Sequence, residues 1–84
     1  MKHWASSRFW ALYEALPSGV RTVADKNFEL LKADPRHASL HLKRIGTIWS
    51  VRVGDRYRAI GHDVPDGIQW FWIGSHAEYE KLIG

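Results

Sequence analysis

Residues 48–61 read IWSVRVGDRYRAIG, a pattern that is typical of two short strands joined by a tight turn. Valine and isoleucine favour strands, and the pair Gly54 and Asp55 has the composition of a turn. Side chains of a strand alternate between the two faces of a sheet, so the register of this hairpin determines which residues each face displays. The rest of the chain can be placed around this hairpin.

The length of the hairpin loop decides the register. A two-residue loop would place arginines opposite Val51 and Val53, which conflicts with burial of the valine face. A three-residue loop, residues 54–56, instead places Tyr57 and Ala59 opposite the valines and gives one continuous apolar face. We therefore predict the register with the three-residue loop.

The opposite face of the hairpin then carries Ser50, Arg52, Arg58 and Ile60. In this register Arg52 and Arg58 are direct cross-strand neighbours, and like charges in that position destabilise a sheet. An anion bound between the two guanidinium groups, such as a phosphate, would relieve the repulsion. Alternatively, both arginines lie in solvent and point away from each other. The hairpin by itself supports both interpretations equally.

Length and composition predict one domain over residues 1–84, large enough for a single core. The chain is 45% hydrophobic, contains no cysteine and has no apolar run of the roughly 20 residues that a membrane span needs. These features predict a soluble cytoplasmic protein without disulfides. A formal net charge of +3 leans towards an anionic partner.

The N-terminal third of the chain predicts a helical hairpin. Lys2–Ala5 is short enough for a brief edge strand. Apolar residues at helical spacing follow Ser6 and Ser7, either of which can cap a first helix. Ser18 is the expected cap of a second helix, and Asp34-Pro35 is expected to end it because the residue before proline avoids helical geometry. Two short helices need a sheet to pack on.

The segment that leads into the strands carries two histidines. Leu40 and Leu42 alternate with polar residues, which predicts an extended chain. His37 and His41 are four residues apart, and on a helix this spacing would place both on one face. No third ligand accompanies them, so we interpret them as polar loop residues and predict no metal site.

Residues 68–73 read IQWFWI and predict a strand that is covered on both faces. A loop over residues 63–67 would pair this strand with the hairpin so that Trp72 lies opposite Arg58, with Trp70 on the same face. Arginines beside indole rings suit a nucleic-acid surface, because bases stack on aromatic rings and phosphates pair with guanidinium groups. We predict that another element covers Trp70 and leave Trp72 open.

A short C-terminal helix follows that strand. Ser75 with Glu78 three residues later is the pattern of a capping box, in which each residue satisfies the backbone N–H of the other. His76, Tyr79 and Ile83 then share one face of the helix. Because this helix begins where the strand ends, we expect its first turn to lie near the arginines of the hairpin.

Three segments together resemble the RelE/ParE superfamily of toxins from bacterial toxin–antitoxin pairs. They are FELLKADPRHASLHLKRIG at residues 28–46, WSVRVGDRYRAIG at 49–61 and WFWIGSHAEYEKL at 70–82. The resemblance implies an α+β fold, in which a helical hairpin packs on a small, mainly antiparallel sheet that precedes a short C-terminal helix. It also implies a cognate antitoxin that wraps the toxin and blocks it, with oligomers formed only through that complex.

RelE-like members of the superfamily cleave mRNA on the ribosome. The resemblance places Arg58 at the position of their arginine after the hairpin turn and Arg52 at a basic position on the preceding strand. His76 and Tyr79 match a basic residue and a tyrosine that follow the last strand. Two departures stand out, since RelE itself has arginine at the His76 position and Ser50 replaces a second lysine that some members carry.

Cleavage of this kind needs no metal or other cofactor, because the RNA 2′-hydroxyl is the nucleophile. His76 has a side chain whose ordinary pKa, about 6.5, suits proton transfer at neutral pH. Arg58 and Arg52 can stabilise the pentavalent phosphorane, and Tyr79 can stack on a base or donate a hydrogen bond. General base and general acid are not assigned separately. Predicted RNA-binding residues are Lys43, Arg44, Arg56 and Trp72.

Two other functions fit the same resemblance. A ParE-like toxin would inhibit DNA gyrase and would lack the acid–base residues. An inactive member would only bind its antitoxin through the basic face. Broken DNA with intact mRNA would indicate the first, and harmless overexpression of folded protein would indicate the second.

Overall fold

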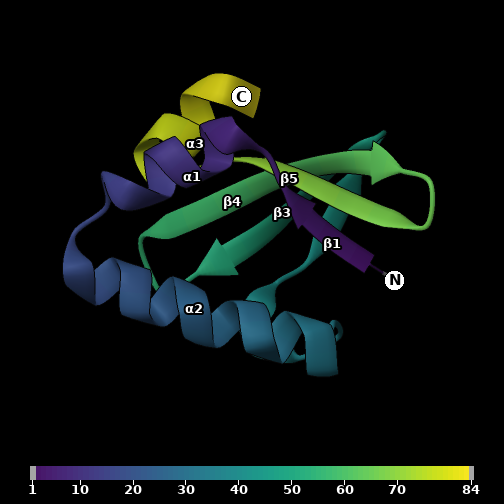
Figure 1. Cartoon of the computed structure of the whole chain (residues 1–84), viewed down its shortest axis with the longest axis horizontal. Helices are drawn as coiled ribbons and strands as arrows, with labels where there is room; N and C mark the ends of the chain where they lie inside the picture. Colours follow the sequence, from purple (N-terminus) through teal and green to yellow (C-terminus); the bar gives the residue numbers. More distant parts are fainter. Residues whose placement is uncertain (1, 84) are drawn as a thin grey trace.

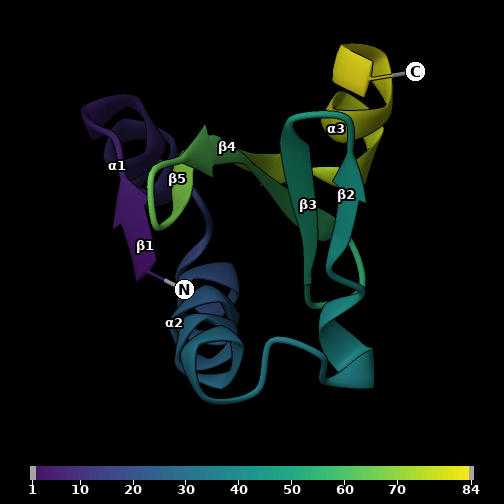
Figure 2. The same ribbon diagram turned by 90° about the vertical axis from the view of Figure 1, so that its right-hand side faces the viewer.

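The computed structural model describes residues 2–83 as one mixed sheet with helices on both of its sides (Figure 1). The strands follow the order β1-β5-β4-β3-β2, in which only the β1–β5 pair is parallel. Figure 2 shows α2 and α3 on opposite sides of the sheet, and side chains of α1 pack with those of α2 into one buried group. The elements are β1 (Lys2–Ala5), α1 (Ser7–Glu14), α2 (Ser18–Ala33), a 3₁₀ turn (Ala38–Leu40), β2 (Lys43–Ile45), β3 (Ile48–Val53), β4 (Tyr57–Val64), β5 (Gly67–Ser75) and α3 (His76–Ile83).

The β3–β4 hairpin has the predicted register. Val53 pairs with Tyr57, Val51 pairs with Ala59, and the loop between the strands has three residues. Gly54 takes a φ of 62° in this loop, a left-handed conformation that glycine adopts without the steric penalty of a Cβ atom. The predicted apolar face is confirmed, since both valines are buried in the main core.

The predicted pairing of β4 with β5 is wrong. Trp72 lies opposite Ile60, and Gly74 is the residue opposite Arg58. Strand β4 continues to Val64 and leaves a two-residue turn, in which Asp66 takes a φ of 70°. A bulge between residues 60 and 61 then shifts the register by one residue. Because one extra residue exchanges the faces of a strand, Trp70 lies on the opposite face from Trp72.

The two N-terminal helices form mostly as predicted. Ser6 caps α1, and its hydroxyl accepts a hydrogen bond of 3.2 Å from the backbone N–H of Phe9. Ser18 was expected to cap α2, but Pro17 holds the cap position and Ser18 is the first helical residue. Asp34 ends α2 directly before the proline, as predicted. Helix α1 packs over β5 and α2 over β3.

The segment before the hairpin differs from the extended chain that its leucines predicted. Leu40 is fully buried in the 3₁₀ turn. His41 ends this turn in a left-handed conformation, with a φ of 44°. The chain becomes extended at Lys43, where β2 pairs with β3 and forms one edge of the sheet. At the other edge, Lys2–Ala5 forms a strand, which the sequence had only allowed.

Two groups of buried side chains hold the sheet. The larger one fills the space between the sheet and the helices α1 and α2, and its floor includes Val51, Ala59 and Trp70. The smaller group lies under α3 and consists of Ile60, Trp72 and Tyr79. None of the helices within residues 2–83 has the length and apolarity that a membrane crossing requires. The site described next lies beside the smaller group.

Candidate functional site

Arg58 occupies the centre of the face that α3 covers. Its side chain is buried, with 6% of the residue exposed. Its Nε–H donates to the hydroxyl of Ser50 over 2.9 Å, and one terminal nitrogen donates to the carbonyl oxygen of His41 over 3.4 Å. Within residues 2–83 no carboxylate forms an ion pair with it. The guanidinium is therefore held by neutral partners and keeps its full positive charge.

Helix α3 brings Tyr79 onto Arg58 and places His76 beside Tyr79. The guanidinium carbon of Arg58 lies 4.9 Å from the centre of the Tyr79 ring, at a distance typical of a cation–π contact. The ring of His76 lies 5.7 Å from that of Tyr79. The first turn of α3 is held by the predicted capping box, because Ser75 and Glu78 exchange hydrogen bonds of 3.1 and 3.2 Å. The expectation that this turn lies near the arginines holds for Arg58, which contacts Tyr79.

Arg52 does not join this group. It is the register partner of Arg58, yet its guanidinium turns back over the hairpin loop. There it donates to the carbonyl oxygen of Gly54 and pairs with the carboxylate of Asp55, both at 2.9 Å. The two guanidinium groups therefore point in different directions, and that of Arg52 lies nearer to solvent. Arg58 turns into the protein instead.

The four predicted RNA-binding residues have different surroundings. Lys43 and Arg56 are exposed, and Lys43 shares the face of Arg58 because it pairs with Ser50. Arg44 points to the other face of the sheet, where Asp63 forms an ion pair with it. Trp72 is only 7% exposed under α3, so it contributes to packing and offers no free ring for a base.

The sequence analysis did not predict the roles that two residues have in the site. Ser50 is 1% exposed and serves as the acceptor for Arg58. Glu80 lies 2.9 Å from Nε2 of His76 and supplies the carboxylate that the predicted set lacked. The spacing of four residues on a helix could have indicated the His76–Glu80 pair. Ser50 gave no such signal, because its partner depends on how the side chain of Arg58 turns.

His37 and His41, the two histidines considered as metal ligands, have no cluster of further ligands around them within residues 2–83. No group of three or more potential ligands gathers within residues 2–83. Nδ1 of His37 contacts the hydroxyl of Ser39 at 2.8 Å and the backbone N–H of the same residue at 3.2 Å. This histidine therefore acts as a local cap of the 3₁₀ turn.

The hydroxyl of Tyr79 yields a stability prediction. It is buried and has no hydrogen-bond partner within the described residues, and an unpaired buried hydroxyl costs free energy. We expect Tyr79→Phe to raise the free energy of unfolding by about 1 kcal/mol, because the ring face toward Arg58 remains. Urea denaturation checks this, with Tyr57→Phe as a control at a tyrosine that is only partly buried. A loss of stability in Tyr79→Phe would show that the hydroxyl has a partner.

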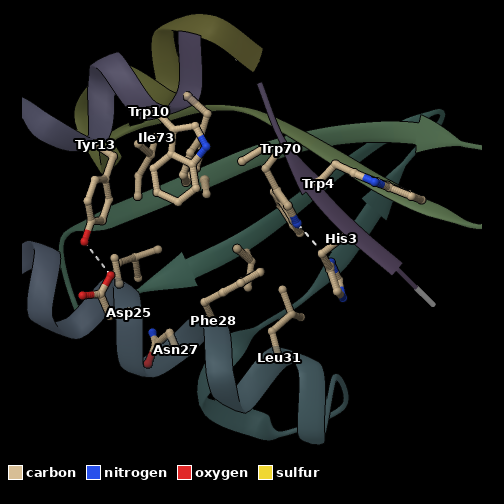
Figure 3. A pocket seen from close by; sticks show the side chains of 16 residues that line it. His3, Trp4, Trp10, Tyr13, Asp25, Asn27, Phe28, Leu31, Trp70 and Ile73 are labelled. Atoms are coloured by element: carbon tan, nitrogen blue, oxygen red, sulfur yellow. Dashed lines mark hydrogen bonds between the residues drawn. The ribbon is translucent and has the colours of Figure 1, made fainter. Parts of the chain in front are cut away.

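A second feature lies on the opposite face of the sheet. An apolar groove of about 290 Å³ opens between α1 and α2, with the main core as its floor. Figure 3 shows Trp10 and Tyr13 of α1 and Phe28 of α2 pointing into it from opposite sides. Trp10 is 50% exposed and Phe28 is 39% exposed. The hydroxyl of Tyr13 donates to Asp25 over 2.5 Å and bridges the two helices, and this hydrogen bond raises the pKa of Tyr13.

His3 lies at one end of this groove, and its hydrogen bond makes the stability of the fold depend on pH. The indole N–H of Trp70 donates to Nδ1 of His3 over 3.1 Å, which requires a neutral imidazole (Figure 3). Burial lowers the pKa of His3 below its usual value of 6.5, and the positive charges of the amino terminus and Lys32 lower it further. The unfolded chain therefore binds the proton more readily. The stability that depends on neutral His3 is complete above about pH 6.5 and is lost as the pH falls through the lowered pKa.

We expect the free energy of unfolding of the wild type to fall more between pH 7.5 and pH 5 than that of His3→Gln. Urea denaturation of both proteins at the two pH values measures the difference. Because the other histidines are common to both proteins, their contributions cancel in this comparison. An equal fall in the two proteins would mean that the Trp70 hydrogen bond does not depend on the charge of His3.

The fold can now be compared with known proteins. No curated protein is similar enough in sequence to match this chain. Two solved structures have the same fold, each with 15% sequence identity. RelE in the RelB–RelE antitoxin–toxin complex from Methanococcus jannaschii has a TM-score of 0.73, with 96% of this chain and 99% of that chain covered.

The isolated E. coli RelE toxin has a TM-score of 0.64, with 95% of this chain and 93% of that chain covered. A family model described as the ParE-like toxin domain matches residues 20–81, which is most of the chain. That range includes most of α2, the hairpin, β5 and all four predicted catalytic positions. The chain therefore belongs to the ParE-like toxin domain family.

Proposed function

We propose that this protein is the toxin of a toxin–antitoxin pair and that it cleaves mRNA on the ribosome. The observation that carries the proposal is the buried guanidinium of Arg58, which has no carboxylate partner within residues 2–83 and lies against the ring of Tyr79, with the ring of His76 beside that of Tyr79. An uncompensated buried cation favours an anion far more than an exposed one does, because little water screens it. A phosphate with its developing charge is such an anion.

The proposed reaction breaks one phosphodiester bond. The ribose 2′-oxygen attacks phosphorus and the bond from phosphorus to the 5′-oxygen breaks, which leaves a 2′,3′-cyclic phosphate and a 5′-hydroxyl. One proton leaves the 2′-hydroxyl and one is delivered to the 5′-oxygen. His76 is the residue suited to proton transfer, and Glu80 orients its ring. Arg58 stabilises the phosphorane, and exposed Lys43 and Arg56 bind the RNA backbone.

The first experiment is to induce the protein in a bacterial host and map mRNA ends on translating ribosomes. New ends inside codons are expected for the wild type and are expected to be lost in His76→Ala. His62→Ala is the matched control, since His62 is also an exposed histidine but belongs to β4 and not to α3. Growth arrest with intact mRNA and broken DNA would instead identify a gyrase inhibitor. Folded protein without growth arrest would identify a module that only binds an antitoxin.

The partner that we propose is an antitoxin that lays an apolar, partly acidic segment into the groove between α1 and α2. The groove is open, and its rim carries the exposed rings of Trp4, Trp10 and Phe28. Aromatic rings of this kind are frequent anchors of protein interfaces. The net charge of +3 favours an acidic partner over a second copy of the same basic chain.

We expect Trp10→Ala to weaken antitoxin binding by at least about tenfold, as is typical when a central aromatic anchor is removed. Calorimetric titration with the product of the neighbouring gene measures the affinity. Leu82→Ala on α3 is the matched control, because Leu82 is 57% exposed and lies outside the groove. If Leu82→Ala weakened binding and Trp10→Ala did not, the antitoxin would bind the α3 face. Protein that self-associates without the antitoxin, and less so as Trp10→Ala, would show that a second copy fills the groove.

A further inference from the structure

Ser50 is buried next to the charged group of the site and does no chemistry of its own. We propose that it is a positioning residue, whose hydroxyl holds the Arg58 guanidinium in place for a phosphate without neutralising it. This inference rests on the proposed function, because it concerns the same phosphate site. It adds a role for a residue that itself carries no charge.

The burial of Ser50 requires its hydroxyl to have a partner. Ser50 is 1% exposed and is one of the three most fully buried side chains of the described residues. An unpaired hydroxyl at this depth would be costly, and Nε–H of Arg58 satisfies it over 2.9 Å. The two residues lie on neighbouring strands and on one face, since Ser50 pairs with Ile60 and Arg58 with Arg52. The contact is therefore built into the register of the hairpin.

The chemistry of the acceptor distinguishes Arg58 from the two nearby arginines. Arg52 is paired with Asp55 and Arg44 with Asp63, so each has a carboxylate that cancels its charge. The side-chain acceptor of Arg58 is instead the hydroxyl of Ser50, which accepts from Nε. A hydroxyl orients the guanidinium as a carboxylate would, but it leaves the positive charge available to a ligand. The arrangement suits an anion site and would be an inefficient way to stabilise the fold alone.

Two further contacts hold the guanidinium of Arg58. The carbonyl oxygen of His41 accepts from Arg58 over 3.4 Å, and His41 reaches this position in the left-handed conformation, at φ 44° and ψ 45°. That conformation is costly for a residue other than glycine, so the surrounding structure imposes it. The ring of Tyr79 covers the guanidinium from the α3 side. All three groups that contact the guanidinium are uncharged. Of the two hydrogen-bond acceptors, only the hydroxyl of Ser50 belongs to a side chain, so it can be removed by mutation.

The test measures binding of inorganic phosphate by NMR at the Nε–H resonances of arginine. In the wild type, phosphate is expected to shift the Arg58 resonance in a saturable way. Arg52 serves as the internal control, because its Nε–H donates to a backbone carbonyl and its charge is paired, so its resonance should not move. Ser50→Ala is expected to weaken phosphate binding about tenfold, and Ser50→Thr, which keeps the hydroxyl, should restore it. Ser50→Asp should hold Arg58 in place and abolish phosphate binding.

Unchanged phosphate affinity in a folded Ser50→Ala would overturn the role of Ser50 and leave the proposed function intact. If Ser50→Ala does not fold, Ser50→Thr is the deciding variant. A phosphate affinity equal to that of the wild type would support the hydroxyl as the acceptor. A loss of phosphate affinity while Arg58 stays in place would refute this role. A wild type in which phosphate leaves the Arg58 resonance unmoved would overturn the anion site and the positioning role together. Mapping of mRNA ends then tests the proposed function independently.

Discussion

Arg58→Ala is expected to reduce mRNA cleavage by about 100- to 1,000-fold, the usual loss when one preorganised donor to a transition state is removed. The effect should be large because the guanidinium is buried and no carboxylate within residues 2–83 neutralises it. Cleavage of a ribosome-bound message by purified protein measures the rate. Arg52→Ala is the matched control, since it removes the same group from the register partner whose charge is already paired with Asp55.

The variant also affects stability, and the two effects must be separated. Removing Arg58 leaves the buried hydroxyl of Ser50 without its donor, which costs about 1–3 kcal/mol. Arg58→Lys keeps a positive charge but loses the planar guanidinium with its paired N–H donors, so this variant is expected to cleave at an intermediate rate. Thermal unfolding of each variant shows which of them are folded at the assay temperature. Full cleavage by folded Arg58→Ala, or an equal loss in Arg52→Ala, would contradict the assignment of the site.

Gly67→Ala is expected to separate β1 from the sheet and to lower the free energy of unfolding by about 1–3 kcal/mol. A Cβ atom at Gly67 would lie 1.9 Å from the carbonyl oxygen of Lys2, and a backbone atom cannot yield as a flexible side chain can. Gly67 and Lys2 are register partners in the parallel pair, so the clash lies at the start of β1. Hydrogen exchange of the β1 amides and urea denaturation measure the two effects.

Gly19→Ala is the matched control for this prediction. No atom lies within 4 Å of a Cβ at Gly19, which is the second residue of α2. Alanine is the better helix former, so this variant should be as stable as the wild type or more stable by up to about 1 kcal/mol. Unchanged protection of the β1 amides in Gly67→Ala would mean that the strand pair tolerates a wider spacing there.

The hairpin and the helices could be predicted because their patterns leave few alternatives. Alternating valines allow only one register that buries a single face, and the observed pairing of Val51 with Ala59 follows from it. The capping box at Ser75 is likewise local and independent of the rest of the fold. Family resemblance added the arrangement of these elements, which the patterns alone do not specify.

Strand β5 could not be placed from its sequence, because a continuous apolar run has no alternation to set its phase. Residues 68–73 would look equally buried in either register, so the bulge next to Gly61 left no trace in the pattern. A Cβ at Gly61 would lie 2.5 Å from Ile68, which shows how closely the strands approach there. The prediction that Trp70 is covered was nevertheless right, because both faces of β5 are covered.

Most contacts of the arginine side chains could not be predicted from the sequence either. Asp55 lies three residues from Arg52 across the turn, and this pair could have been expected from spacing. The contact of Arg58 with Ser50 depends on the rotamer of a long side chain, and the cover that Tyr79 provides depends on where α3 settles. The groove between α1 and α2 is a property of unfilled space, which no residue pattern records.

The parallel pairing of β1 with β5 joins residue 2 to residue 67 and has a consequence during synthesis of the chain. Strand β1 is made before β5 and stays without its neighbour until residues 67–70 have been translated. His76 and Tyr79 are made later still. Under the proposed function, a nascent chain that still lacks β5 and α3 can complete neither the groove nor the nuclease site.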